Sequence, residues 1–238
     1  MNIEEYYKHQ GAARGLSSVE DVLGAVEIKG KLYNRLIRDW LPREKDASIY
    51  EVACGSGIFL HWLRSQGYAN ASGSDSSRTE IDLAKAGSLD VKLADSVAEL
   101  RAMPAESRDC IVGFDFYEHL PKEVMLDFLA ESGRVLRPNG IFLLRGPNGD
   151  SPVIGRSLFN DITHHWALTS TAFQALLNMA GFRRVEFRDD ALASIERQRI
   201  AKLPFAWIAQ QILRVLLRSA TREDIRCLSA SFFVRAIK

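Results

Sequence analysis

Apolar and polar positions along this chain follow two spacings, which alternate from one segment to the next. Short apolar runs predict buried strands, and apolar residues three or four positions apart predict helices. The predicted strands are "SIYEVA", "ASGSD", "DVKLAD", "RDCIVGF", "IFLLRG", "RRVEF" and "SFFVRAI". The predicted helices lie within 17–41 and 58–67, over "RTEIDLAKAG" and "KEVMLDFLAESGRVL", and from Thr169 to Gly181. This alternation predicts an α/β fold, with a mostly parallel seven-stranded sheet and helices on both faces.

The pattern predicts one α/β core with additions at two places. Pro42 and the polar run "REKDAS" separate an N-terminal helical cap, residues 1–45, from a main domain over 46–238. About forty residues lie between the last two predicted strands, far more than a hairpin needs, so 188–228 is predicted to be a helical insertion.

Residues 203–218 of this insertion have apolar side chains at helical spacing, interrupted by Arg214 and Arg218. The stretch is too short and too polar to cross a bilayer. Its alternatives are internal packing or a substrate lid, a homodimer contact, and peripheral contact with a membrane.

Composition and charge exclude some classes of function. The chain has 47% apolar and 26% charged residues, which is typical of an ordinary globular protein. The net charge is +1, and no strongly basic surface is expected in the first 182 residues, so nucleic acid is not an expected partner. Residues 183–238 carry 12 basic and 6 acidic side chains. Three scattered cysteines and a start without a secretory signal favour reduced thiols and a cytoplasmic protein, with peripheral contact to the inner membrane as the alternative.

The stretch "IYEVACGSGIF", residues 49–59, has the form of a strand that runs into a nucleotide-binding loop. A dinucleotide fingerprint requires a third glycine, and Leu60 stands in its place. Glu51 at the end of the strand suits a cation better than a pyrophosphate. Asp75 and Asp95 close the next two predicted strands, where they can accept from ribose hydroxyls and from an adenine amino group. A helix cap is the alternative for Asp95.

These segments together resemble the class I S-adenosylmethionine-dependent methyltransferases. The resemblance rests on "IYEVACGSG", "GSD", "LAD", "CIVGFDFYEHL", "RVLRPNGIFLL" and "MAGFRRVEF", and covers roughly residues 48–187. It implies a Rossmann-like fold and S-adenosylmethionine as the cofactor. The cofactor contacts expected from it are Glu51, Ala53, Gly55, Gly57, Asp75, Ser76, Asp95, Ser96 and Phe114. Ala53 stands where many members have the first glycine of ExGxGxG, which alanine can replace if its φ is negative.

Candidate catalytic residues follow the fourth and fifth predicted strands. The first is His119 in "DFYEHL", and the others are Asp161, His164 and His165 in the long segment 147–168. A histidine oriented by a carboxylate can take a hydroxyl proton near pH 7, and His164 or His165 with Asp161 is the first choice. In the alternative, Asp161 and Thr163 cap a turn. Metal ligation by Asp161 and the two histidines is a weaker alternative, because further acidic ligands are not evident, so no metal is expected.

Arg145, Asn148 and Tyr117 are the predicted substrate contacts. Arg145 ends a buried strand, where a charge must be paired or face a cleft, so it can bind a substrate carboxylate or phosphate. A salt bridge to Glu118 or Asp115 is the alternative.

A segment of the form "PN…DxTH…T" ahead of "AGF" is similar to methyltransferases of bacterial surface-polysaccharide biosynthesis. This resemblance implies O-methylation of a small molecule or saccharide. Methylation of a quinone-like, lipid-soluble aromatic is one alternative, and a module that binds S-adenosylmethionine without catalysis is another.

Overall fold

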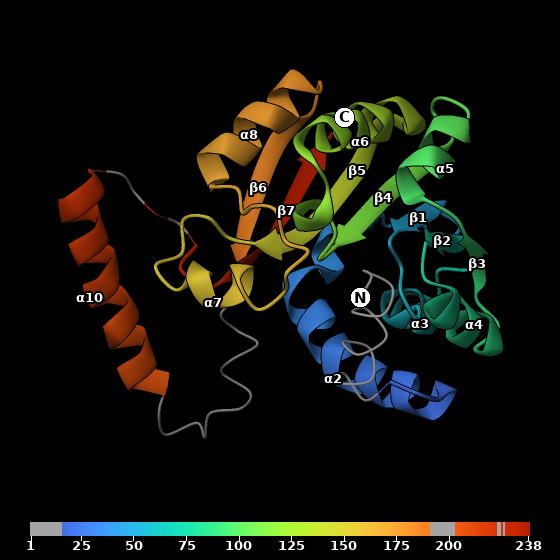
Figure 1. Cartoon of the computed structure of the whole chain (residues 1–238), viewed down its shortest axis with the longest axis horizontal. Coiled ribbons are helices and arrows are strands. Elements are labelled where there is room, and N and C mark those ends of the chain that lie inside the picture. Colours follow the sequence, from blue (N-terminus) through green and yellow to red (C-terminus); the bar gives the residue numbers. More distant parts are fainter. Residues whose placement is uncertain (1–15, 191–202, 223–224, 226) are drawn as a thin grey trace.

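A seven-stranded sheet forms the centre of the protein in a computed structural model, which describes residues 16–190, 203–222, 225 and 227–238 (Figure 1). The strand order is β3-β2-β1-β4-β5-β7-β6, and β7 runs antiparallel to both of its neighbours. The strands are β1 (Ile49–Val52), β2 (Ala71–Asp75), β3 (Asp90–Leu93), β4 (Arg108–Phe114), β5 (Leu136–Pro147), β6 (Arg183–Asp189) and β7 (Ser231–Ile237). The predicted mostly parallel seven-stranded sheet is confirmed.

Helices cover both faces of this sheet. They are α2 (Val19–Leu36), α3 (Ile58–Ser65), α4 (Arg78–Ala86), α5 (Ser96–Ala102), α6 (Lys122–Val135), α7 (Ile154–Leu158), α8 (Ser170–Met179) and α10 (Leu203–Thr221), with 3-10 turns η1 (Arg38–Trp40) and η2 (Tyr117–His119). Figure 1 shows α5, α6 and α8 on one face and α2, α3 and α4 on the other. Two apolar clusters fill the layers, one around Phe128 and Phe173 and the other around Phe59 and Trp62.

The observed elements follow the sequence pattern with three differences. Helices α5 and α7 were not predicted, because seven and five residues are too few for the apolar spacing to repeat. Strand β5 begins at Leu136, ahead of the predicted turn at 138–140. Its pairing with β4 steps from Leu136 to Ile141, and Asn139 has φ +64°, so the turn is an irregularity within the strand.

Parallel pairing of β1 with β2 and β4 determines where the chemistry lies. Val52, the last residue of β1, is level with Ser74 of β2 and Gly113 of β4. The segments that follow these three strands therefore leave the sheet at one edge, as parallel register requires.

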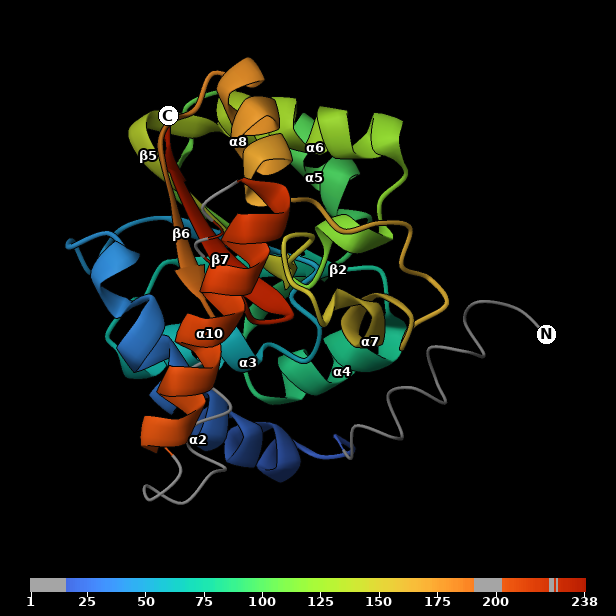
Figure 2. The ribbon, with the colours of Figure 1, turned by 90° about the vertical axis from the view of Figure 1, so that its left-hand side faces the viewer.

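The helix predicted in the insertion is present as α10. It carries large, exposed apolar side chains at Ile208, Ile212, Val215 and Leu216. Figure 2, turned toward α10, shows this helix in front of the sheet. Within the described ranges, none of the helices combines the length and apolar character needed to cross a bilayer. Parts of two predicted units, 1–15 of the cap and 191–202, 223–224 and 226 of the insertion, lie outside the described residues.

Candidate functional site

The loop between β1 and α3 is built from three residues with left-handed backbone. The φ values are +49° at Ala53, +52° at Gly55 and +80° at Gly57. Glycine at 57 is favoured by its left-handed φ, and a Cβ there would lie 2.1 Å from Leu89 Cδ1, so the Leu89 side chain would also have to move. The loop consequently makes a sharp turn at the carboxyl edge of the sheet.

Ala53 does not meet the condition under which alanine replaces glycine without strain. Its φ of +49° is positive, whereas the sequence interpretation required a negative value. A Cβ in this region costs roughly 1–2 kcal/mol for a non-glycine residue. The loop therefore keeps the turned shape of the glycine motif at the cost of backbone strain.

Glu51 lies beneath this loop with a carboxylate oxygen that lacks a hydrogen bond. The side chain is 4% exposed, and its Oε2 has no hydrogen-bond partner among the described residues. Burial raises the pKa of Glu51 well above its ordinary value of 4.5, Lys29 of α2 opposes the rise, and Asp75 adds to it. A buried polar atom left without a partner is costly. A cationic group such as an ammonium, arriving at the loop, would satisfy it.

Asp75 joins the loop to the helix that follows β2. Its Oδ2 accepts a hydrogen bond from Gly55 N at 2.9 Å, and its Oδ1 accepts from Ser77 N at 2.8 Å. Each carboxylate oxygen can accept more than one hydrogen bond. Asp75 can therefore take part in holding the loop and also accept from two hydroxyls, as its predicted role requires.

A buried chain of hydroxyl groups supports the loop from below. Ser96 Oγ accepts from Ala53 N at 2.9 Å and lies 3.0 Å from Ser74 Oγ, to which the Tyr50 hydroxyl donates at 2.7 Å. Tyr50 and Ser74 were missed from the sequence because both lie inside strands. Asp95 caps α5 by accepting from Ala98 N at 2.8 Å. Asp95 therefore makes the helix cap that was the alternative to cofactor binding. A contact of Asp95 with adenine stays a prediction.

The two remaining predicted cofactor contacts differ in their surroundings. Ser76 is exposed after β2. Phe114 ends β4 and packs against Tyr33 of α2, Phe59 of α3 and Phe233 of β7, with ring centroids 4.8–5.9 Å apart. An aromatic wall therefore stands beside the loop.

Arg145 is held by two acids. Its guanidinium donates to Asp190 Oδ2 from Nε at 3.1 Å and from an η nitrogen at 2.6 Å, and its other η nitrogen donates to Asp115. The salt bridge to Asp115 is one of the alternatives named for Arg145, whereas the salt bridge to Asp190 was not predicted. Contact of Arg145 with a substrate stays a prediction.

Tyr117 and Asn148 are buried, with protein partners. The Tyr117 hydroxyl donates to the Pro147 carbonyl, and Asn148 Nδ2 donates to the carbonyls of Cys227 and Ser229 at 2.9 Å. These contacts tie the 147–168 segment to the sheet. Contact of either residue with a substrate stays a prediction.

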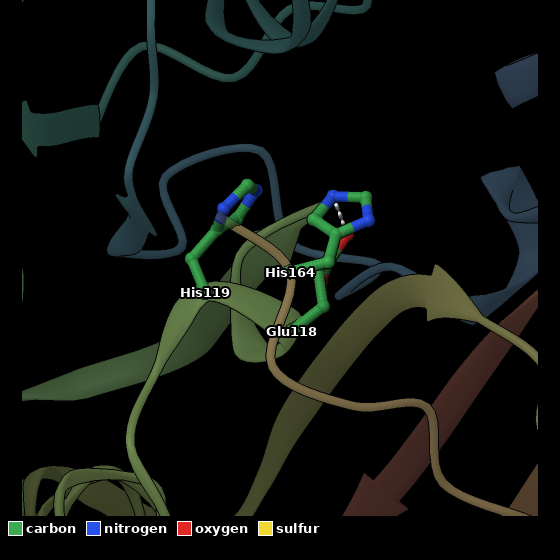
Figure 3. Close-up of side chains that lie close together, drawn as sticks. All are labelled: Glu118, His119 and His164. Carbon is green, nitrogen blue, oxygen red and sulfur yellow. Dashed lines mark ion pairs between the residues drawn. The ribbon is translucent and has the colours of Figure 1, made fainter. Parts of the chain in front are cut away.

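Three side chains from two segments meet near this edge of the sheet. Glu118 and His119 come from η2, and His164 comes from the segment after α7 (Figure 3). One nitrogen or oxygen from each lies within 4.8 Å of the others. His164 Nε2 is 4.0 Å from Glu118 Oε1, and the two imidazole rings are 4.7 Å apart. We call these three residues the Glu-His-His cluster.

Glu118 is the most deeply buried member of the cluster. It is 2% exposed, and its Oε2 has no hydrogen-bond partner within the described ranges. Burial raises the pKa of Glu118 well above its ordinary value of 4.5, with Asp115 adding to the rise. Sequence reasoning did not assign Glu118 a chemical role, although it lies next to the candidate His119.

Hydrogen bonds fix the protonated nitrogen of both rings. Thr163 has one hydroxyl proton and donates it to Asp161 Oδ1 at 2.6 Å, so its Oγ1 accepts from His119 Nδ1 at 2.8 Å. The Leu158 carbonyl can only accept, so His164 Nδ1, at 3.1 Å, also carries a proton. The lone pair of each neutral ring is therefore on Nε2. The Asp161 side chain is linked to the His119 ring through Thr163.

His165 is outside the cluster. Its backbone N donates to the Glu118 carbonyl at 2.8 Å, but its side chain is exposed. Of the two histidines named first as bases, the structure brings only His164 to the other candidates.

Comparisons with known proteins agree on one family. The family described as a methyltransferase domain matches residues 27–186. A probable S-adenosylmethionine-dependent methyltransferase of Mycolicibacterium smegmatis is 37% identical over 87 residues, which is 37% of this chain and 33% of that protein's length.

Solved structures share the fold at low sequence identity. An S-adenosylmethionine-dependent methyltransferase from Archaeoglobus fulgidus has a TM-score of 0.65 and 19% identity, over 85% of this chain and 91% of its own. Phosphoethanolamine N-methyltransferase 2 of Haemonchus contortus, in complex with S-adenosylmethionine, has a TM-score of 0.63 and 14% identity, over 93% of this chain and 57% of its own.

Replacing Ala53 with glycine is expected to stabilise the protein. Relief of roughly 1–2 kcal/mol of left-handed strain exceeds the roughly 0.5–1 kcal/mol that glycine costs in backbone entropy. Urea unfolding of Ala53→Gly should show a gain of about 0.5–1 kcal/mol. Ala130→Gly, at an exposed position in the middle of α6, is the control and should lose a similar amount. A loss at both positions would contradict strain at Ala53.

Glu51→Gln is expected to stabilise the ligand-free protein above about pH 5 and to weaken cofactor binding. The unfolded state ionises Glu51 above about pH 4.5 while the folded state holds the proton, so the free energy of unfolding falls as pH rises. The glutamine variant should remove this part of the slope, as measured by urea unfolding from about pH 5 to about pH 8. Its affinity for S-adenosylmethionine should fall about tenfold or more. Exposed Glu44→Gln should change neither quantity, and an unchanged slope in Glu51→Gln would contradict the assignment.

Proposed function

This chain belongs to the methyltransferase-domain family, and from that premise we propose that it transfers a methyl group from S-adenosylmethionine to a hydroxyl oxygen of a small molecule or saccharide. Membership confirms the resemblance to S-adenosylmethionine-dependent methyltransferases, together with the methyltransferase class and its cofactor. The acceptor and the residues that act on it are the proposed part.

The residues at the β1–α3 loop fit the cofactor. Oε2 of Glu51 is a buried acceptor in need of a donor, Gly55 and Gly57 give the loop its left-handed turns, and Asp75 can accept from ribose hydroxyls. When bound, S-adenosylmethionine supplies a methyl group on a positively charged sulfur. The buried acids at this edge favour a cation over a pyrophosphate.

The observation that carries the proposal is the Glu-His-His cluster, which follows β4 at the same edge as the loop. An acceptor hydroxyl needs to lose a proton as its oxygen becomes a nucleophile, and a neutral imidazole is suited to take it near pH 7. His164 has its Nε2 lone pair directed to the Glu118 side, and its Nδ1 proton is held by Leu158. His164 is the first candidate base, and His119, oriented through Thr163, is the second.

A glycan acceptor of bacterial surface-polysaccharide biosynthesis is the finer form of the proposal. The support is the 147–168 segment, whose His164 joins the cluster and whose form resembles that of such enzymes. An acceptor oxygen on a quinone-like aromatic would suit the same base. The alternative to an enzyme is a module that binds S-adenosylmethionine without catalysing a reaction.

The exposed face of α10 is an argument that the methyl acceptor is lipid-linked or is an anionic polymer. Ile212 and Leu216 are more than half exposed, and Arg214 and Arg218 lie on the same helix. A helix that combines apolar and basic side chains in this way binds at an anionic membrane surface. The alternatives for α10 are a homodimer contact and a substrate lid.

The proposed activity is tested by measuring cofactor binding and turnover on the same variants. Calorimetric titration of wild type with S-adenosylmethionine, S-adenosylhomocysteine and NAD should show binding of the first two only, and Asp75→Ala should lose it. S-adenosylhomocysteine formation should then be measured with saccharide, phenol and quinol acceptors. His164→Ala should lower kcat at least about tenfold with cofactor affinity retained, because general-base catalysis contributes about a hundredfold or more.

His165→Ala is the matched control, since that side chain is exposed, and it should keep normal turnover. Normal turnover in both His164→Ala and His119→Ala would mean that the cluster is not the base. Cofactor binding without product from any acceptor would favour the binding module.

Membrane contact through α10 is tested by flotation. Wild-type protein should float with vesicles that contain anionic lipid, and the double change Ile212→Ser with Leu216→Ser should lower the bound fraction about tenfold or more. Ile28→Ser, at an exposed position of α2, is the control and should leave flotation unchanged. Equal flotation of all three proteins would remove α10 as the contact.

A further inference from the structure

We propose that the Glu-His-His cluster is a binding site for one divalent transition-metal ion, of the kind that prefers mixed nitrogen and oxygen ligands. Nitrogens of His119 and His164 and a carboxylate oxygen of Glu118 are the donors. Two imidazoles with one carboxylate hold zinc in catalytic sites and iron in others, and both kinds of site leave positions open.

The arrangement of lone pairs calls for a cation. Both rings carry their proton on Nδ1, so each Nε2 has a lone pair that can bind a metal ion. The carboxylate oxygens of Glu118 also have lone pairs that can bind it. The Glu118 carboxylate is buried, and its Oε1 is 4.0 Å from His164 Nε2, too far for a hydrogen bond. An ion among these atoms would be attracted by the buried carboxylate and would accept the lone pairs of both rings.

The distances fit a site that closes slightly around an ion. Ligand atoms about 2.1 Å from a tetrahedral ion lie roughly 3.4 Å from one another. The donors of the cluster lie within 4.8 Å, so the side chains need to move together by about an ångström. Glu118 and His119 stand on one short turn, and His164 stands on a separate segment that a hydrogen bond from His165 N to the Glu118 carbonyl holds beside that turn.

The partners of the two rings are those that metal-binding histidines require. A histidine that ligates through Nε2 usually donates its Nδ1 proton to a carbonyl or a carboxylate, which fixes the ring. His164 donates to the Leu158 carbonyl, and His119 donates to Thr163, which is bonded to Asp161. Asp161, named from the sequence as a ligand in the metal alternative, lies behind the ring of His119 in this arrangement. The acidic ligand that the sequence did not make evident is Glu118.

The role of the ion rests on the proposed function. An ion with open positions can bind the acceptor hydroxyl and lower its pKa, so that its proton is lost to water near neutral pH. The two imidazoles then act as ligands, and the ion takes over the part of the base. Adjacent oxygens of a saccharide or of an aromatic diol would bind such an ion in pairs.

The metal site is tested without turnover. Protein stripped with EDTA should be titrated calorimetrically with Zn²⁺, with Co²⁺ absorption as a second readout of the ligand set. One ion per chain is expected, and Glu118→Gln and His164→Ala should each weaken binding at least tenfold. Thr163→Val, which removes the acceptor behind His119, should weaken binding about tenfold. His165→Ala is the control, and circular dichroism should show that all four variants fold.

Binding that does not change in Glu118→Gln and His164→Ala, or the absence of binding, would overturn the metal site. Turnover that survives removal of the ion by EDTA would overturn its role at the acceptor and leave the proposed methyl transfer standing. Specific binding of one ion, with no product from any acceptor, would support the site while the proposed function failed.

Discussion

Parallel pairing of β1 with β2 and β4 is the constraint on which the site depends. Because Val52 is level with Ser74 and Gly113, the chain leaves all three strands at the same edge. One edge therefore receives the glycine loop, Asp75 and the turn that carries Glu118. A shift of one residue in this register would turn every side chain of the strand to the opposite face.

Burial of acidic side chains at this edge destabilises the folded state. Glu51 and Glu118 are almost fully buried, each with an oxygen that lacks a hydrogen bond among the described residues. Arg145 is stabilised by Asp115 and Asp190, whereas Lys29 offsets only part of the effect of burial on Glu51. Groups of this kind mark functional sites more often than structural ones. The apolar clusters on both faces of the sheet keep the edge folded despite them.

The sequence predicted the sheet, most helices and the cofactor loop, because each depends on local spacing. Strand β2 has the predicted ends, and α8 lies within the predicted range from Thr169 to Gly181. What a local pattern could not supply was the conformation of Ala53, the hydroxyl chain from Tyr50 to Ser96, and the pairing of Arg145 with Asp190. Each depends on segments far apart in the chain. The meeting of Glu118 with His164 is of the same kind, since 46 positions separate them.

The connection between β6 and β7 shows where this architecture can change. The two strands pair from Asp189 opposite Phe232, although about forty residues separate them in the chain. Each doubling of a flexible loop costs only about 0.6 kcal/mol in closure entropy, so a connection eight times longer than a tight one adds about 2 kcal/mol. A long insertion beside the edge strand of the sheet therefore lowers the stability of the fold only slightly. Relatives with the same sheet can carry different helices there, and so can evolve new docking properties without repacking the core.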